Sequence, residues 1–159
     1  MVISVEKVRE FFFAGMIKGY ASGAEAEPIP KLPGFKGYRH SDEDGLTLLD
    51  YYAPSSTGFS AGSTIIWLDG IPIWLMTYEG WYENCVTSLL KEALMEAYTK
   101  GVFLGGRGIN RVAVDDGAEY INIDPGSNFC FFSGIEQIVH GGNVLGTHSF
   151  RGGCLVDMR

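Results

Sequence analysis

Two stretches of the chain place apolar residues at the three-and-four spacing of a helix. The first covers residues 5–18, with Ser4 as its N-cap and Gly19 as its stop. The second follows Asn84, which we expect to cap it, and ends at Gly101. Its apolar positions are Val86, Leu89, Leu90, Ala93, Leu94, Ala97 and Tyr98. Each stripe predicts an amphipathic helix that packs against a core.

Residues 65–78 predict a β-hairpin, because Asp69-Gly70 is a strong signal for a two-residue type I′ turn between two apolar runs. Simple pairing across the turn gives one face made of Ile66, Leu68, Ile71, Ile73 and Leu75, and another made of Ile65, Trp67, Pro72, Trp74, Met76 and Tyr78. Both faces are apolar. We therefore expect the helices to cover the first face, and the second half of the chain, a partner chain or a ligand to cover the other.

The segments 42–80 and 114–152 carry the same landmarks when one is shifted by 72 positions. The identical pairs are Asp44/Asp116, Gly45/Gly117, Ser55/Ser127, Phe59/Phe131, Gly62/Gly134, Ile66/Ile138, Gly70/Gly142 and Gly80/Gly152. We interpret this as an internal duplication. It predicts a single α+β domain over residues 1–159, built from two α-β-β-β units (about 4–80 and 84–153) whose antiparallel strands are covered by two helices.

The two predicted units differ in detail. Their first strands are expected at 46–52 and 118–123, and the Pro- and Gly-rich residues 23–38 are expected to form a loop. In the second hairpin, Val139, Val144, His148 and Phe150 share one face, while Glu136, His140, Asn143, Thr147 and Ser149 lie on the other with Ile138 and Leu145. The pattern therefore predicts a half-exposed second hairpin. A site between the units would combine aromatic groups of the first unit with a histidine or small polar groups of the second.

Composition places the chain among well-cored globular proteins, with 46% hydrophobic and 19% charged residues. The three cysteines, Cys85, Cys130 and Cys154, contain no CxxC pair, which predicts reduced thiols in a reducing compartment. The early apolar stretch at 11–17 is too short for a membrane span, and it lacks the features of a secretory signal. We therefore expect a cytoplasmic protein that does not contact membranes.

The net charge of −7 is concentrated in one region, because no Lys or Arg occurs between Arg39 and Lys91. Binding to DNA or RNA requires a basic face that displaces counterions from phosphates. No such cluster occurs in the sequence, and we expect no direct contact with nucleic acid.

Motifs for catalysis or metal binding are incomplete. The acidic turn at 40–45 lacks the ligand spacing of a calcium loop, and His40, His140 and His148 are too scattered to form a metal set. Gly105-Gly106-Arg107-Gly108 lacks the spacing of a phosphate-binding loop and reads as a flexible connector. Cys85, near the start of the second helix, has no histidine partner in the sequence. We predict no metal, no cofactor and no catalytic residue, and we consider an enzyme less probable than a binding protein.

The most promising ligand-binding surface is the aromatic face of the first hairpin. Its candidate residues are Trp67, Trp74, Met76 and Tyr78, joined by His148 and Phe150 from the second unit. Two indoles and a tyrosine on one face are costly to leave in water, so something must cover them.

The chain resembles a family of small bacterial and archaeal domains of unknown function, some of which follow an Xre-type helix-turn-helix domain. The residues that carry the resemblance are Tyr20-Ala21, Gly23, Trp67, Gly70, Pro72, Trp74, Met76, Tyr78, Gly80, the run Leu90-Lys91-Glu92-Ala93-Leu94, Glu136, Gly142 and Gly152-Gly153. Such a family would have a proline after Arg107-Gly108, where this chain has Ile109. The resemblance implies a sensory or interaction module. Because only a few residues precede the first helix, we expect no helix-turn-helix domain here.

Our leading hypothesis is therefore a cytoplasmic binding or sensory module that takes a small apolar or aromatic molecule, or a protein segment, at the junction of the two units. The alternative is a homodimerisation module that binds no ligand. A hydrolase or transferase that uses His148 or Cys85 is the third possibility.

Overall fold

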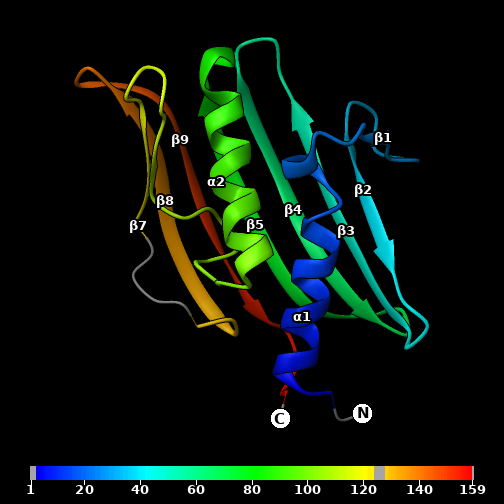
Figure 1. Ribbon diagram of the computed structural model, residues 1–159. Helices are drawn as coiled ribbons and strands as arrows, with labels where there is room; N and C mark the ends of the chain where they lie inside the picture. Colours follow the sequence, from blue (N-terminus) through cyan, green and yellow to red (C-terminus); the bar gives the residue numbers. More distant parts are fainter. Residues whose placement is uncertain (1–2, 124–127, 159) are drawn as a thin grey trace.

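A computed structural model describes residues 3–123 and 128–158 of the chain. It is an α+β fold, as predicted: one nine-stranded sheet curves around two helices that lie on the same face (Figure 1). All neighbouring strands are antiparallel, in the order β1-β2-β3-β4-β5-β9-β8-β7-β6. The elements are α1 (Val5–Met16), η1 (Tyr20–Ser22), β1 (Glu27–Pro28), β2 (Lys36–Ser41), β3 (Leu46–Pro54), β4 (Phe59–Leu68), β5 (Ile71–Tyr82), η2 (Asn84–Val86), α2 (Thr87–Lys100), β6 (Arg111–Val112), β7 (Glu119–Ile123), β8 (Phe131–His140) and β9 (Asn143–Cys154).

The helix signals in the sequence are largely confirmed. Ser4 caps α1, since its hydroxyl accepts a hydrogen bond from the backbone N–H of Lys7 at 3.2 Å. Gly101 ends α2 in the left-handed conformation. Asn84 does not cap α2 as expected. It opens the short 3-10 turn η2 instead, and α2 begins at Thr87.

The sheet contains strands that the α-β-β-β pattern did not predict. The segment 23–38, expected to be a loop, contains β1 and the start of β2, and β6 precedes β7. Pro28 is tolerated in β1 because this strand lies at the edge of the sheet, where a missing N–H leaves no neighbouring carbonyl unpaired. The two expected three-stranded units, β3-β4-β5 and β7-β8-β9, are joined into one sheet by pairing of β5 with β9.

A bulge corrects the predicted faces of the first hairpin. Trp67 pairs with Pro72, but Ile66 pairs with Trp74, so Ile73 is an extra residue in β5. An extra residue reverses the alternation of side chains beyond it. Trp74, Met76 and Tyr78 therefore face the helices together with Ile66, while Trp67 is half-buried on the opposite face.

The second hairpin contains a matching irregularity. Ile138 pairs with Gly146 and Val139 with Val144, so Leu145 is the extra residue. This shift corrects the sequence assignment again, because Glu136 lies directly opposite His148 and both are buried on the helix-facing side. The inner face of this hairpin is therefore buried, and it carries both Glu136 and His148.

The two halves of the sheet show further parallels at the 72-residue offset. The turn residues Asp69-Gly70 have φ of 50° and 81°, and Gly141-Gly142 have φ of 57° and 81°, values that favour glycine and fit a type I′ turn. Where the halves meet, Tyr78 pairs with Phe150, its own counterpart at that offset. One pair of the sequence alignment, Ser55/Ser127, cannot be compared because Ser127 lies outside the described residues.

The centre of the core is an aromatic cluster around Trp74, which is fully buried. Its ring stacks on Phe129 at 5.0 Å between centroids and on Phe132 at 5.7 Å, and Phe12 of α1 packs against it at 5.1 Å. The indole N–H donates to the carbonyl of Phe129 at 2.9 Å. These contacts attach α1 and the start of β8 to β5.

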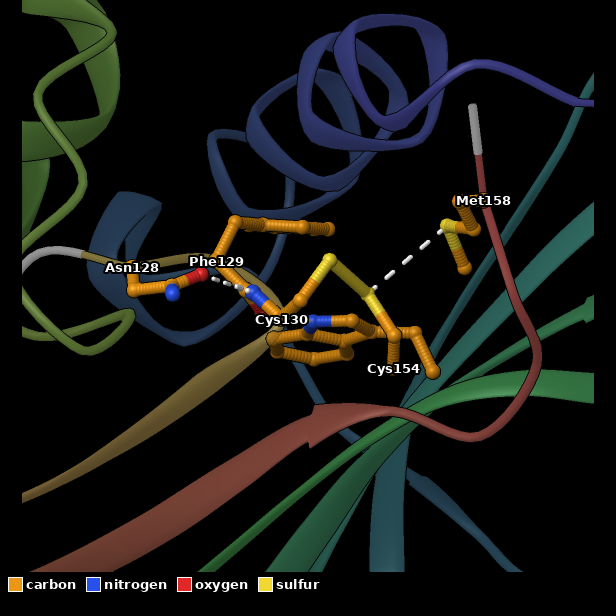
Figure 2. Close-up of a disulfide and its surroundings, with 6 residues drawn as sticks. Asn128, Phe129, Cys130, Cys154 and Met158 are labelled. Carbon is orange, nitrogen blue, oxygen red and sulfur yellow. Dashed lines mark hydrogen bonds between the residues drawn. A yellow bond between two sulfur atoms is a disulfide. The ribbon is translucent and has the colours of Figure 1, made fainter.

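The cysteines differ from the sequence prediction. Cys130 and Cys154 form a disulfide (Figure 2). Cys85 is free and exposed. The two bonded residues are far apart in sequence, but pairing of β8 with β9 brings their Cα atoms to 4.4 Å, a distance that the sequence alone could not reveal. The bond joins the entry of β8 to the end of β9, beside Trp74, with which Cys154 is paired across the strands.

Neither helix within residues 3–123 and 128–158 combines the length and the apolar character needed to cross a membrane.

Candidate functional site

A cavity of about 90 Å³ lies between the sheet and helix α2, where the two halves of the sheet meet. Strands contribute polar and aromatic side chains to its wall: Asp50, Tyr52, Ser60, Tyr78, Tyr82 and His148. Helical segments contribute Met16, Tyr20, Ala21, Leu90, Leu94 and Tyr98, and Arg107 enters from the segment after α2. The cavity thus combines aromatic walls with an acid, an arginine and a histidine.

A second hollow, of about 780 Å³, lies on the opposite face of the sheet. It is a more open groove over β4, β5, β9 and β8, with Thr77, Ser149 and Arg151 among its lining residues. Because the cavity encloses buried charged groups and the groove does not, we regard the cavity as the candidate site.

Asp50 is the cavity's unpaired acid. Its side chain is 5% exposed, and one carboxylate oxygen, Oδ1, accepts hydrogen bonds from the hydroxyls of Thr64 and Tyr78, both at 2.8 Å. Within the described ranges, Oδ2 accepts no hydrogen bond and Asp50 forms no ion pair. Burial raises the pKa of the Asp50 carboxyl, because the charged form loses its hydration.

Arg107 is the cavity's only arginine, and Glu136 already binds it. Its Nε donates to Glu136 Oε1 at 3.0 Å, and its Nη2 donates to the same oxygen. The hydroxyls of Tyr82 and Tyr120 also donate to Glu136. Burial alone would raise the pKa of Glu136, but the adjacent guanidinium outweighs burial and lowers it. The carboxylate therefore stays charged, and it neutralises Arg107.

This network also fixes the glycine-rich segment at 105–108, which the sequence suggested was a flexible connector. Arg107 is 6% exposed, and the hydroxyl of Tyr98 in α2 donates to the carbonyl of Gly106 at 3.0 Å. The backbone N–H of Gly108 donates to the Tyr120 hydroxyl at 2.9 Å. A Cβ at Gly108 would lie 2.8 Å from the backbone of Ala93, so only glycine fits this close approach to α2.

His148 lies between Glu136 and Ser60. Its Nε2 is 3.2 Å from the Ser60 hydroxyl, and its Nδ1 is buried without a hydrogen bond in the described part of the chain, 3.9 Å from Glu136 Oε1. Its ring packs on Tyr82 at 4.5 Å between centroids. Burial, with help from Arg107, lowers the pKa of His148 to about 4, despite the opposing effect of Glu136. The imidazole is neutral at pH 7.

Acid should therefore destabilise the fold through His148. The folded protein binds fewer protons than the unfolded chain between the folded pKa of about 4 and the ordinary value of 6.5. The stability that the neutral ring contributes is fully present above pH 6.5 and is lost as pH falls towards 4. The loss is roughly 3 kcal/mol of unfolding free energy. We expect His148→Gln to lose less stability than the wild type between pH 7 and pH 4.5, measured by urea unfolding. Equal losses in both proteins would contradict this role of His148.

The structure separates the six residues predicted to bind a ligand. Tyr78 and His148 line the cavity, and their rings lie 6.1 Å apart. Trp74, Met76 and Phe150 lie in the core on the same side of the sheet and do not line the cavity, and Trp67 lies on the opposite face. The third possibility was a hydrolase or transferase that uses His148 or Cys85. His148 lines the cavity, whereas Cys85 lines a separate surface hollow with Glu92 and Arg111.

Sequence reasoning missed Asp50, Arg107, Glu136 and Tyr20 as site residues. A signal existed for two of them, because Glu136 is a lone charge within an apolar strand and Arg107 is a lone charge in a glycine-rich segment. Charged residues in such contexts are seldom buried without a partner. No group of three or more His, Cys, Asp or Glu side chains in the described residues could hold a metal ion.

A family with the description "Domain of unknown function (DUF5680)" matches residues 50–155. The chain belongs to the DUF5680 family. The expected membership of a family of unknown function is confirmed. The DUF5680 region starts at Asp50 and includes every strand residue of the cavity wall, together with Arg107 and Glu136, whereas Tyr20 and Ala21 precede it. No curated protein and no solved structure matches the chain.

Proposed function

We propose that the protein is a binding or sensory module that holds a small molecule in the cavity between the sheet and α2. The observation that carries this proposal is the unpaired, buried carboxylate of Asp50 on the cavity wall. A buried acid without an ion-pair partner lowers the stability of the fold, and natural proteins keep such groups mainly where they serve a function.

The position of the cavity also supports the proposal. Tyr78 on β5 and His148 on β9 come from different halves of the sheet, so the cavity lies at the junction where a ligand was expected. The cavity's walls are mostly apolar or aromatic, with few polar groups, which is the usual composition of a small-molecule site.

Filling the cavity should abolish binding. We expect a fragment mixture, studied by ligand-observed NMR, to yield binders of the wild type that Ala21→Phe no longer binds, because the added ring occupies the cavity beside Tyr20. Ala24→Phe, which places the same ring at an exposed position outside the cavity, is the matched control and should retain binding. Binders that survive Ala21→Phe would locate the site elsewhere, and a screen without binders would count against the proposal.

The alternative of a homodimerisation module is favoured by a different surface. Phe131, Ile135 and Ile123 are 81%, 47% and 57% exposed, and they share the outer face of β8 and β7. Exposed apolar strips of this kind often mark protein interfaces. Sedimentation equilibrium distinguishes the two functions, because a ligand-binding monomer keeps its mass at all concentrations.

We further propose that the chain contains an internal duplication and that it acts without direct contact with DNA or RNA. We also propose that it is cytoplasmic, although disulfides such as Cys130–Cys154 are uncommon in that compartment. The matching bulges and type I′ turns at the 72-residue offset support the duplication. The kinship expected with bacterial and archaeal domains beside Xre-type regulators belongs to the same proposal.

A further inference from the structure

Resting on the function proposed above, we propose that the cavity binds a small molecule with a protonated amine, and that Asp50 is its counter-ion. The charges of the cavity lead to this choice. Glu136 forms the ion pair with Arg107 through two hydrogen bonds, so Asp50 has no ion-pair partner in residues 3–123 and 128–158, and the charge of Arg107 acts on it only at longer range. An ammonium group placed at Oδ2 would supply that partner.

The existing hydrogen bonds of Asp50 prepare it for this role. Thr64 and Tyr78 both donate to Oδ1, which fixes the orientation of the carboxylate and leaves Oδ2 available. A preorganised acceptor binds a cationic donor with little loss of side-chain freedom. Burial keeps water from competing, so the ion pair is stronger here than on the surface.

The aromatic walls suit a cation as well. Two tyrosines of the cavity already contact lysine side chains: Lys91 Nζ lies 4.9 Å from the centre of the Tyr20 ring, and Lys36 Nζ lies 5.6 Å from that of Tyr52. Arg107 lies over the Tyr78 ring at 5.4 Å. Tyrosine rings attract cations through their negative faces, so the same walls can surround an alkyl ammonium.

An anionic ligand fits the charges less well. Its negative group would have to lie near Asp50. Of the basic side chains on the cavity wall, Arg107 is held by Glu136 and His148 is neutral at pH 7, while Lys91 and Lys36 contact tyrosine rings of the wall without lining the cavity. The volume of about 90 Å³ restricts the ligand to a compact molecule, since cavities that hold benzene are nearer ~150 Å³. A short branched alkyl amine satisfies both limits.

Three probes of the same shape and different charge test the proposal: isobutylamine, isobutanol and isobutyrate, each titrated into the wild-type protein at pH 7 and followed by protein-observed NMR. We expect isobutylamine to bind about tenfold more tightly than isobutanol or better, and isobutyrate to bind most weakly. Equal affinity for the amine and the alcohol, tighter binding of isobutyrate, or no binding of any probe would each overturn the proposal.

Asp50→Asn removes the charge and keeps an oxygen that can accept from Thr64 and Tyr78. This variant should lose the preference for the amine and retain its affinity for isobutanol. Glu79→Gln is the matched control, because Glu79 follows Tyr78 in β5 but is exposed on the opposite face, and it should leave the preference intact. A preference that survives Asp50→Asn would overturn the proposal.

The ratio of amine to alcohol affinity in the wild type tests the proposal even if Asp50→Asn does not fold. The same measurements distinguish failure of the amine preference from failure of ligand binding in the cavity. If the fragment screen finds binders that Ala21→Phe abolishes but amines are not preferred, only the inference about the amine fails. If no compound enters the cavity, the proposed function fails with it.

Discussion

Replacing Arg107 with methionine is expected to lower the free energy of unfolding by about 3–5 kcal/mol, the range typical when one partner of a buried ion pair is removed. The change leaves the carboxylate of Glu136 in the core without its cation. It also removes the contact between the 105–108 segment and Glu136, while the hydrogen bond from the Gly108 N–H to Tyr120 still holds the segment on the sheet. Chemical denaturation followed by tryptophan fluorescence measures the loss.

Two controls define this prediction. The double variant Arg107→Met/Glu136→Leu removes both charges and should recover part of the lost stability, since no unpaired charge remains. Lys100→Met breaks the exposed pair with Glu96 and should cost less than about 1 kcal/mol. A loss in Arg107→Met no larger than that in Lys100→Met would contradict the buried network.

Trp74→Ala is expected to cost about 3–5 kcal/mol of unfolding free energy, as large truncations in a core do. Trp74 is 0% exposed, and Phe12, Phe129 and Phe132 of the same chain cover its ring. The change also leaves the carbonyl of Phe129 without the hydrogen bond that it accepts from the indole N–H. Urea denaturation at several protein concentrations measures the cost and separates it from any change in association.

Trp67→Ala is the matched control, because Trp67 belongs to the same hairpin but is only half-buried on the opposite face. It should cost clearly less than Trp74→Ala. If Trp74→Ala left stability nearly unchanged and abolished ligand binding instead, Trp74 would belong to a binding surface. The simple strand pairing without a bulge suggested such a surface.

The helices, the hairpin turns and the α+β class could be predicted from the sequence, because each depends on local signals. Ser4 and Gly101 mark helix ends through their own backbone preferences, and Asp69-Gly70 does the same for a turn. The family resemblance rested on residues that include Trp74 and Gly80, and the family match confirms kinship with a domain of unknown function.

The faces of the strands could not be predicted, because one extra residue moves every side chain beyond it in the strand to the other face of the sheet. Ile73 and Leu145 look like ordinary strand residues in the sequence, and only the register shows that they are bulged. For the same reason the sequence placed Glu136 and His148 on opposite faces, although they lie directly across from one another.

The candidate site was predictable only in part, because its chemistry depends on contacts between distant segments. Tyr78 was identified through its aromatic neighbours, whereas Asp50 looked like any strand acid, and its partners Thr64 and Tyr78 come from two other strands. Arg107 and Glu136 are 29 positions apart, and no spacing rule connects them. The disulfide between Cys130 and Cys154 escaped prediction for the same reason.

A crystal structure of the protein soaked with the binders from the fragment screen tests the central claim most directly. We expect ligand density in the cavity, in contact with Asp50, Tyr78 and His148. Density confined to the outer groove over β4, β5, β9 and β8, or a cavity that stays closed to compounds that bind in solution, would contradict it.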